Sequence, residues 1–134
     1  MSIQLSVSSI APWVLRVVAA VIMLQTLYFK FTGAEESVYI FSQLGMEPWG
    51  RIGTGILELI ASILILYPRT TFFGSALAMG LMCGAILAHL TKLGISVMND
   101  GGQLFIYALL VLISSTILAF IYRNDGLNLL KRVF

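Results

Sequence analysis

Four long apolar stretches occupy most of the sequence and limit the folds that it can adopt. They cover residues 12–31, 49–67, 71–90 and 103–122. Each is about 20 residues long, which is the length at which an α-helix crosses the hydrocarbon core of a bilayer. A transmembrane β-barrel would show alternating segments of about ten residues separated by turns, whereas these stretches are continuous. The pattern predicts an all-α integral membrane protein with four spans.

The composition agrees with this prediction. Hydrophobic residues make up 59% of the 134 residues and charged residues only 10%, and the mean hydropathy is +0.97, far from the values typical of soluble domains. The formal net charge is only +2, and the basic residues are scattered, so we expect no nucleic-acid partner. The lipid bilayer is the expected environment of the whole chain.

The connecting segments predict how the spans are arranged. In residues 34–44 the apolar side chains recur at helical spacing, opposite the polar ones, which indicates a short interfacial helix between the first two spans. The connection after the second span is so short that spans two and three must be antiparallel neighbours. Residues 124–134 form a basic amphipathic tail suited to anionic lipid. We predict one transmembrane domain over residues 1–134, an up-down-up-down four-helix bundle.

Basic residues near the span ends predict the orientation. One side carries Arg16, Arg69, Arg123, Lys131 and Arg132, and the other carries Lys30, Arg51 and Lys92. Cytoplasmic loops are richer in lysine and arginine, so the first side, with both termini, is predicted to face the cytoplasm. We expect Arg16 to extend toward lipid phosphate groups on that side. The three basic residues on the outer side are typical of interfacial anchors, and a role in a site is the alternative.

Glu58 is the one acidic residue within the four apolar stretches. Counted from Trp49, it lies about 13 Å along the second span, near the middle of the bilayer. Ionisable groups at that depth are costly, face the bundle interior and often mark function. Gln25 and Tyr107 reach a similar depth on spans one and four, so we predict that they donate hydrogen bonds to the Glu58 carboxyl group. Arg51 leans away from Glu58 along the same helix, and no direct contact is expected.

Further polar residues lie between Glu58 and the outer surface, where Lys30, His89, Arg51, Lys92 and Gln103 form one layer. They predict an outward-facing pocket with Glu58 at its bottom. Its ligand-binding or proton-handling residues are predicted to be Glu58, His89, Gln25, Tyr107, Lys30 and Arg51. For His89, a hydrogen-bonded position at a helix end is an equally good interpretation.

Small residues repeat every four positions in the third span, at Ala76, Gly80, Gly84 and Ala88. Such a stripe lets transmembrane helices approach closely. Packing inside the bundle and packing against another protomer both remain open, so a homo-oligomer is one prediction. Asp100, which precedes two glycines, is expected to cap the start of the fourth span.

Several kinds of chemistry lack the residues that they need. The single histidine and the single cysteine, Cys83, provide no haem ligand pair, no CxxC motif and no zinc-binding spacing. The sequence also contains no nucleotide-binding loop and no pairing of nucleophile and base. We therefore predict no metal site, no catalytic residue and no catalysis by this chain alone.

Four segments of the sequence carry a resemblance to a known family. They are LRVV in the first span, LYFKFTG at its end, FSQLGMEPWGRIGTGILELIASILILYPRT, and LMCGAILAHL in the third span. In these segments the sequence resembles the DoxX-like family of small four-helix bacterial membrane proteins. The landmarks shared with that pattern are Arg16, Lys30, Gly33, Leu44, Gly45, Glu58 and His89. The resemblance implies a bacterial inner-membrane location and association with membrane redox systems linked to quinol or thiosulfate oxidation.

Three functions follow as hypotheses. The leading one is a non-catalytic accessory subunit of a membrane redox system that binds a quinone or another lipid-like molecule around Glu58. The second is an assembly partner of other membrane proteins, without a ligand. The third is a small transporter or proton pathway, which would require an oligomer because four spans leave little machinery for alternating access. No cofactor other than a quinone or lipid is predicted.

Overall fold

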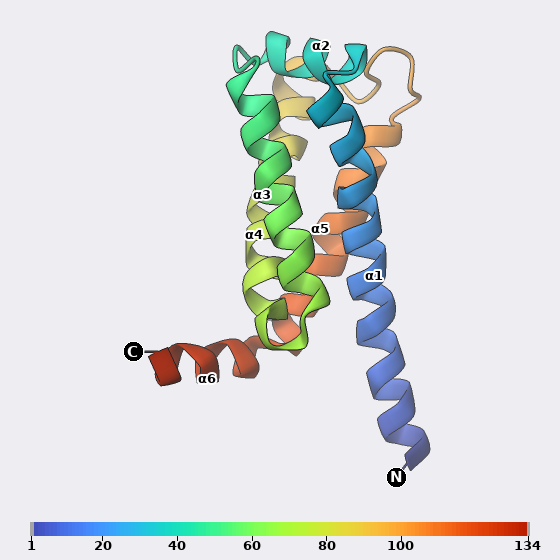
Figure 1. Ribbon diagram of the computed structural model, residues 1–134. Coiled ribbons are helices and arrows are strands. Elements are labelled where there is room, and N and C mark those ends of the chain that lie inside the picture. Colours follow the sequence, from blue (N-terminus) through green and yellow to red (C-terminus); the bar gives the residue numbers. More distant parts are fainter. Residues whose placement is uncertain (1, 134) are drawn as a thin grey trace.

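The computed structural model describes residues 2–133, and within this range it is helical without strands. Four helices are long and apolar enough to cross a membrane: α1 (Ser2–Thr32), α3 (Trp49–Leu66), α4 (Thr71–Ala88) and α5 (Gln103–Ile121). In Figure 1 these helices run up and down beside one another, and both ends of the chain lie at the same end of the bundle. The predicted all-α membrane bundle is confirmed, and the protein is a multi-pass membrane protein.

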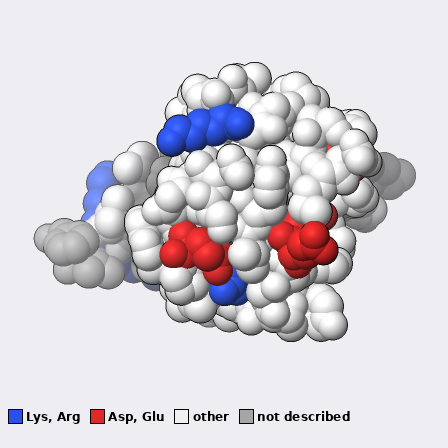
Figure 2. Space-filling model, turned by 90° about the horizontal axis from the view of Figure 1, so that it is seen from above, with Lys and Arg blue, Asp and Glu red and all other residues white. Residues whose placement is uncertain are grey.

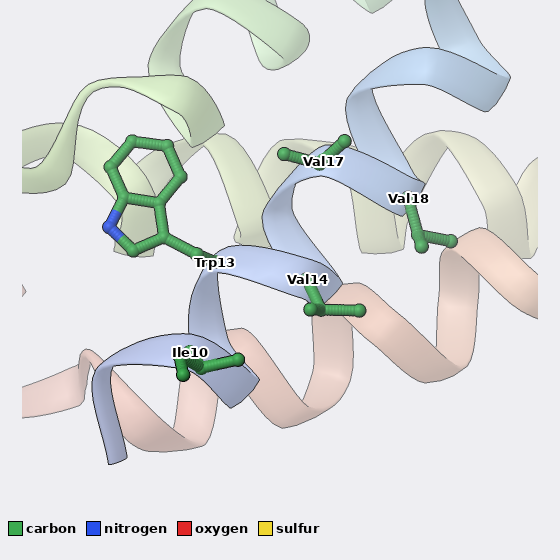
Figure 3. A pocket seen from close by; sticks show the side chains of 5 residues that line it. All are labelled: Ile10, Trp13, Val14, Val17 and Val18. Atoms are coloured by element: carbon green, nitrogen blue, oxygen red, sulfur yellow. The ribbon is translucent and has the colours of Figure 1, made fainter. Parts of the chain in front are cut away.

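The four long helices form a ring. α1 packs against α3 and α5, and α4 packs against the same two helices, so that α1 and α4 lie diagonally opposite. The residues that fill the centre are mostly small or flexible: Ala19, Met23, Ala61, Ile65, Ala78, Met82, Ala108, Val111 and Leu118. Large apolar side chains cover the outside instead, as Figure 3 shows for Ile10, Trp13, Val14, Val17 and Val18 along one side of α1. An apolar exterior and a centre of small or flexible side chains suit a bundle surrounded by lipid chains.

Two short helices lie at opposite ends of the ring. α2 (Glu35–Gln43) crosses one end and turns Ser37 and Phe41 inward, where both are buried. α6 (Arg123–Val133) leaves the other end and runs across the direction of the long helices (Figure 1). Leu127 and Leu130 on α6 are exposed, while Phe134 lies outside the described residues. The short helix expected between the first two spans is present, and the C-terminal tail is also helical.

The hairpin of α3 and α4 is closest at its turn, which contains the 3₁₀ turn η1 (Pro68–Thr70). The Thr71 hydroxyl donates a hydrogen bond to the Ile65 carbonyl oxygen, at 3.0 Å. A Cβ atom added at Gly74 would lie 2.6 Å from the Ile65 nitrogen and 2.8 Å from the Ala61 oxygen. Only a glycine fits at this point, because the backbones of the two helices nearly touch.

Arg16 does not extend to lipid phosphate groups, so that prediction was wrong. Its side chain is only 1% exposed. Its Nε donates to the Ile65 carbonyl oxygen at 2.8 Å, and its Nη2 donates to that of Leu66. These carbonyl groups belong to the last turn of α3, where intrahelical donors are lacking and the helix dipole is negative. The Trp13 ring covers the guanidinium group, whose carbon lies 3.7 Å from the ring centroid.

Gly74→Ala tests the close approach of α3 and α4. The added methyl group must push against backbone atoms, so we expect a loss of unfolding free energy of about 1–3 kcal/mol. Gly80→Ala on the same helix is the matched control, since its methyl group would meet no heavy atom within 4 Å. Alanine is also the better helix former, so the control should be neutral or stabilising. Thermal unfolding in detergent, followed by circular dichroism, measures both, and equal midpoints would contradict the tight contact.

Candidate functional site

A cavity of about 550 Å³ lies inside the ring, in the half that α2 closes. All four long helices and α2 contribute to its wall. Its polar lining residues are Gln25, Thr26, Lys30, Glu36, Ser37, Thr54, Glu58, His89, Gln103 and Tyr107. Apolar side chains, among them Met23, Phe29 and Leu104, make up most of the remaining wall. The volume and the mixture of many apolar and few polar groups are typical of small-molecule sites.

The most deeply buried charges in this cavity form an ion pair. Lys30 Nζ lies 3.3 Å from Glu58 Oε2, and the two side chains are 15% and 6% exposed. The Thr26 hydroxyl lies 3.1 Å from the same carboxyl oxygen and 3.2 Å from Lys30 Nζ. Thr26 and Lys30 are four residues apart and therefore share one face of α1. The three groups form a compact polar cluster between α1 and α3, at membrane depth.

The predicted partners of Glu58 were wrong, although its burial in the bundle was not. Gln25 and Tyr107 line the cavity, but among the described side chains neither donates a hydrogen bond to Glu58. The Tyr107 hydroxyl instead accepts one from Gln103 Nε2, at 2.8 Å.

The missed signal was helix direction. Cβ atoms tilt toward the N-terminus of a helix. Since α1 and α3 are antiparallel, this tilt aims Lys30 and Glu58 at each other.

Arg51 is buried, but it lies outside the cavity wall. Its Nε donates to Glu47 Oε1 at 2.9 Å, and its Nη1 donates to the Lys30 carbonyl oxygen in the last turn of α1. Arg51 therefore caps α1 in the way that Arg16 caps α3, and it makes no contact with Glu58, as expected. Lys92 is exposed, in keeping with an interfacial anchor.

His89 is buried at the end of α4, where the chain forms the π-helical turn η2 (His89–Leu93). Its Nδ1 lies 2.9 Å from the Gly94 carbonyl oxygen. A carbonyl oxygen only accepts hydrogen bonds, so Nδ1 carries the proton and Nε2 of the neutral ring is an acceptor. Nε2 makes no hydrogen bond with any described residue, and His89 lines the cavity. The histidine is thus held by its backbone contact while its second nitrogen stays available.

Two carboxyl groups at the α2 end have shifted pKa values. Asp100 accepts hydrogen bonds from the backbone N–H groups of Val97, Gly102 and Leu104. The N-cap residue of α5 is Gly102 and not the expected Asp100, although the Asp100 carboxylate binds the Leu104 N–H in the first turn. Burial opposes ionisation, but the three backbone hydrogen bonds prevail and hold the pKa of Asp100 below its usual value. For Glu36 on α2, burial and then the charge of Asp100 raise the pKa.

The surface of this end carries charges of both signs. Figure 2, which looks onto the α2 end, shows red patches of Asp and Glu atoms, blue atoms between them, and a separate larger blue patch on the same face. The basic side chains expected at the rim are partly drawn inward, since Lys30 binds Glu58 and Arg51 binds Glu47. Of the three basic side chains expected at the rim, Lys92 is the exposed one.

The small-residue stripe of α4 does not pack closely against another helix of this chain at its two glycines. Ala76, Gly80 and Gly84 are exposed, and a Cβ atom at Gly80 or Gly84 would meet no described heavy atom within 4 Å. Gly80, Gly84 and Ala88 line the cavity instead, whereas Ala76 does not.

Comparison with known proteins gives one family. The family model described as the DoxX-like family matches residues 14–115, a range that contains every cavity residue named above. Neither a curated protein nor a solved structure matches the chain.

Lys30→Met and Glu58→Gln test the ion pair. Each single change leaves a buried polar group without its partner, and we expect Lys30→Met to lower the unfolding free energy by about 3 kcal/mol or more. The double variant Lys30→Met/Glu58→Gln removes both charges and should lie close to the wild type. Thermal unfolding in detergent provides the comparison, with Lys92→Met as the exposed control. Additive losses in the double variant would show that the two groups do not depend on each other.

Glu36→Gln tests the electrostatics of the α2 end. Because the pKa of Glu36 is raised in the folded protein, its ionisation costs stability as the pH rises from its usual value of 4.5 through the raised value. Glu36→Gln should therefore raise the unfolding midpoint at neutral pH. This advantage should disappear at pH values below 4.5, where both forms are neutral. Glu35→Gln, on the same turn but exposed, is the control, and a pH-independent difference would contradict the prediction.

Proposed function

This chain belongs to the DoxX-like family, and from that premise we propose that it is a non-catalytic membrane protein that binds a small lipid-like molecule. The binding site is the cavity around Lys30 and Glu58. One observation carries the proposal: a buried ion pair faces a cavity of about 550 Å³. If the pair only held two helices together, packed side chains would enclose it instead.

The energetics of the ion pair support a binding role. Placing two charges at membrane depth costs several kcal/mol per ion before their attraction and hydrogen bonds compensate. The Lys30 ammonium group has three donors, and its partners among the described residues are Thr26 and Glu58. A donor therefore remains for a ligand. Among the described residues, Glu58 is engaged through Oε2 alone, which leaves Oε1 as an acceptor.

The cavity wall indicates the class of ligand. Tyr107 accepts its hydrogen bond from Gln103 and keeps its own hydroxyl proton for donation. Lys30 and Tyr107 thus provide donors, and His89 Nε2 provides an acceptor, within walls that are otherwise mainly apolar. A molecule with a carbonyl or hydroxyl head and an apolar body matches this lining. A quinone has both features, and it is our leading candidate.

The wider role follows from the family resemblance. We propose an accessory subunit of a quinone-linked redox system in the bacterial inner membrane, where this chain holds the ligand and a partner protein carries out the chemistry. The α6 end, which bears Arg69, Arg123, Lys131 and Arg132 against Asp125, is the cytoplasmic end in this proposal. The α2 end then faces outward.

Native mass spectrometry of the gently extracted protein tests the binding function. We expect the wild type to retain a small molecule whose mass identifies it, and the Lys30→Met/Glu58→Gln variant to lose most of it. The double variant is preferred because removing both charges should preserve the fold. Lys92→Met should retain the ligand. A wild type without bound molecule, both as extracted and after incubation with decyl-substituted benzoquinone, would refute the proposal.

A further inference from the structure

We infer that the ligand enters the cavity sideways from the bilayer, between α3 and α4, and that it is a membrane lipid with a long hydrocarbon chain. The rim of this lateral portal consists of Thr54 on α3 and of Gly80, Gly84 and Ala88 on α4. The inference rests on the proposed binding function and adds to it a route of entry and a requirement for the chain.

The two helices that form the portal touch at one end and separate toward the other. Near the turn, Gly74 of α4 lies against the backbone of Ala61 and Ile65 on α3. Thr54 is seven residues before Ala61, and Leu81 is seven residues after Gly74, so both continue these same helix faces toward α2. At that level Thr54 and Leu81 line the cavity. The direct contact between the helices is therefore replaced by open space.

The glycines connect this space with the outside of the bundle. Gly80 and Gly84 line the cavity, yet both are exposed, and a Cβ atom at either would meet no heavy atom of the described residues within 4 Å. Counted from Thr71 at the turn, Gly80 and Gly84 lie about 13 and 20 Å along α4. Both positions fall within the hydrocarbon core, which is about 30 Å thick. The cavity thus opens to lipid chains at this place.

A second observation points to a ligand independently of the small residues. His89, only 5% exposed, presents an Nε2 atom without a hydrogen-bond partner among the described residues, and it lines the same cavity as Lys30 and Glu58. The polar groups therefore lie inside and the apolar opening lies at the side. A ligand whose head lies at these polar groups and whose chain crosses Gly80 and Gly84 matches both the polar interior and the apolar opening.

The portal is tested by filling it. Gly80→Leu and Gly84→Leu place a side chain in the opening, and the Cβ atom of either would meet no described heavy atom within 4 Å. Ala76→Leu is the matched control, because Ala76 belongs to the same exposed stripe but does not line the cavity. The probes are decyl-substituted benzoquinone and the same quinone without its chain, each equilibrated with protein in phosphatidylcholine vesicles. Native mass spectrometry measures occupancy, and size-exclusion chromatography measures the oligomeric state.

We expect Gly80→Leu and Gly84→Leu to weaken binding of the decyl quinone by about tenfold, since two methylene groups that lose their contact account for that factor. Binding of the chainless quinone should change little, and Ala76→Leu should resemble the wild type.

The other outcomes separate the two proposals. If the wild type binds neither quinone and no other molecule, the binding function itself fails. If it binds the decyl quinone and both leucine variants bind it equally well, the portal is wrong while the binding function stands. A change of oligomeric state with unchanged occupancy would also overturn the portal, because the stripe would then be an interface between copies. Equal losses in Ala76→Leu would place the effect elsewhere.

Discussion

A charge or an unpaired backbone group inside a bilayer has to find its partner within the protein, and the architecture of this bundle depends on how three basic side chains do so. Arg16 of α1 binds the last carbonyl groups of α3, and Arg51 of α3 binds the last turn of α1. Between these two caps, Lys30 of α1 meets Glu58 of α3. All three interactions join the same antiparallel pair, whose helix termini would otherwise expose negative dipole ends to an apolar environment.

The remaining two helices join this pair by packing, and the packing is uneven. In the half near the α3–α4 turn, Gly74 and the buried serines Ser62, Ser75 and Ser115 let the backbones approach. In the other half, α4 ends in the π-helical turn η2, which folds His89 back onto Gly94. Wider turns of this kind are frequent at functional sites. The cavity therefore lies where close packing stops, beneath α2.

The sequence predicted the spans, the connections and the burial of Glu58, because hydropathy and helical length are properties of one segment at a time. It failed where two segments meet. Depth alone placed Gln25 and Tyr107 beside Glu58, although depth does not say which side of a helix faces which neighbour. Arg16 was expected to extend to the lipid phosphate groups because it lies near a span end. The unpaired carbonyl groups at the end of α3 are within its reach, and it binds those instead. Helix direction would have identified Lys30, since in this antiparallel pair the Lys30 side chain tilts toward the level of Glu58 and the Glu58 side chain tilts toward the level of Lys30.

The ion pair also restricts the charge that a ligand can bring into the cavity. An anionic head would gain the attraction of Lys30 but would meet the repulsion of Glu58, which lies 3.3 Å from the same ammonium group. A cationic head would face the reverse balance, with Lys30 beside the carboxyl group that attracts it. In a medium of low dielectric constant both terms are large, so the pair favours neutral molecules that form hydrogen bonds. A neutral carbonyl or hydroxyl head with an apolar chain meets this requirement and leaves the two charges paired with each other.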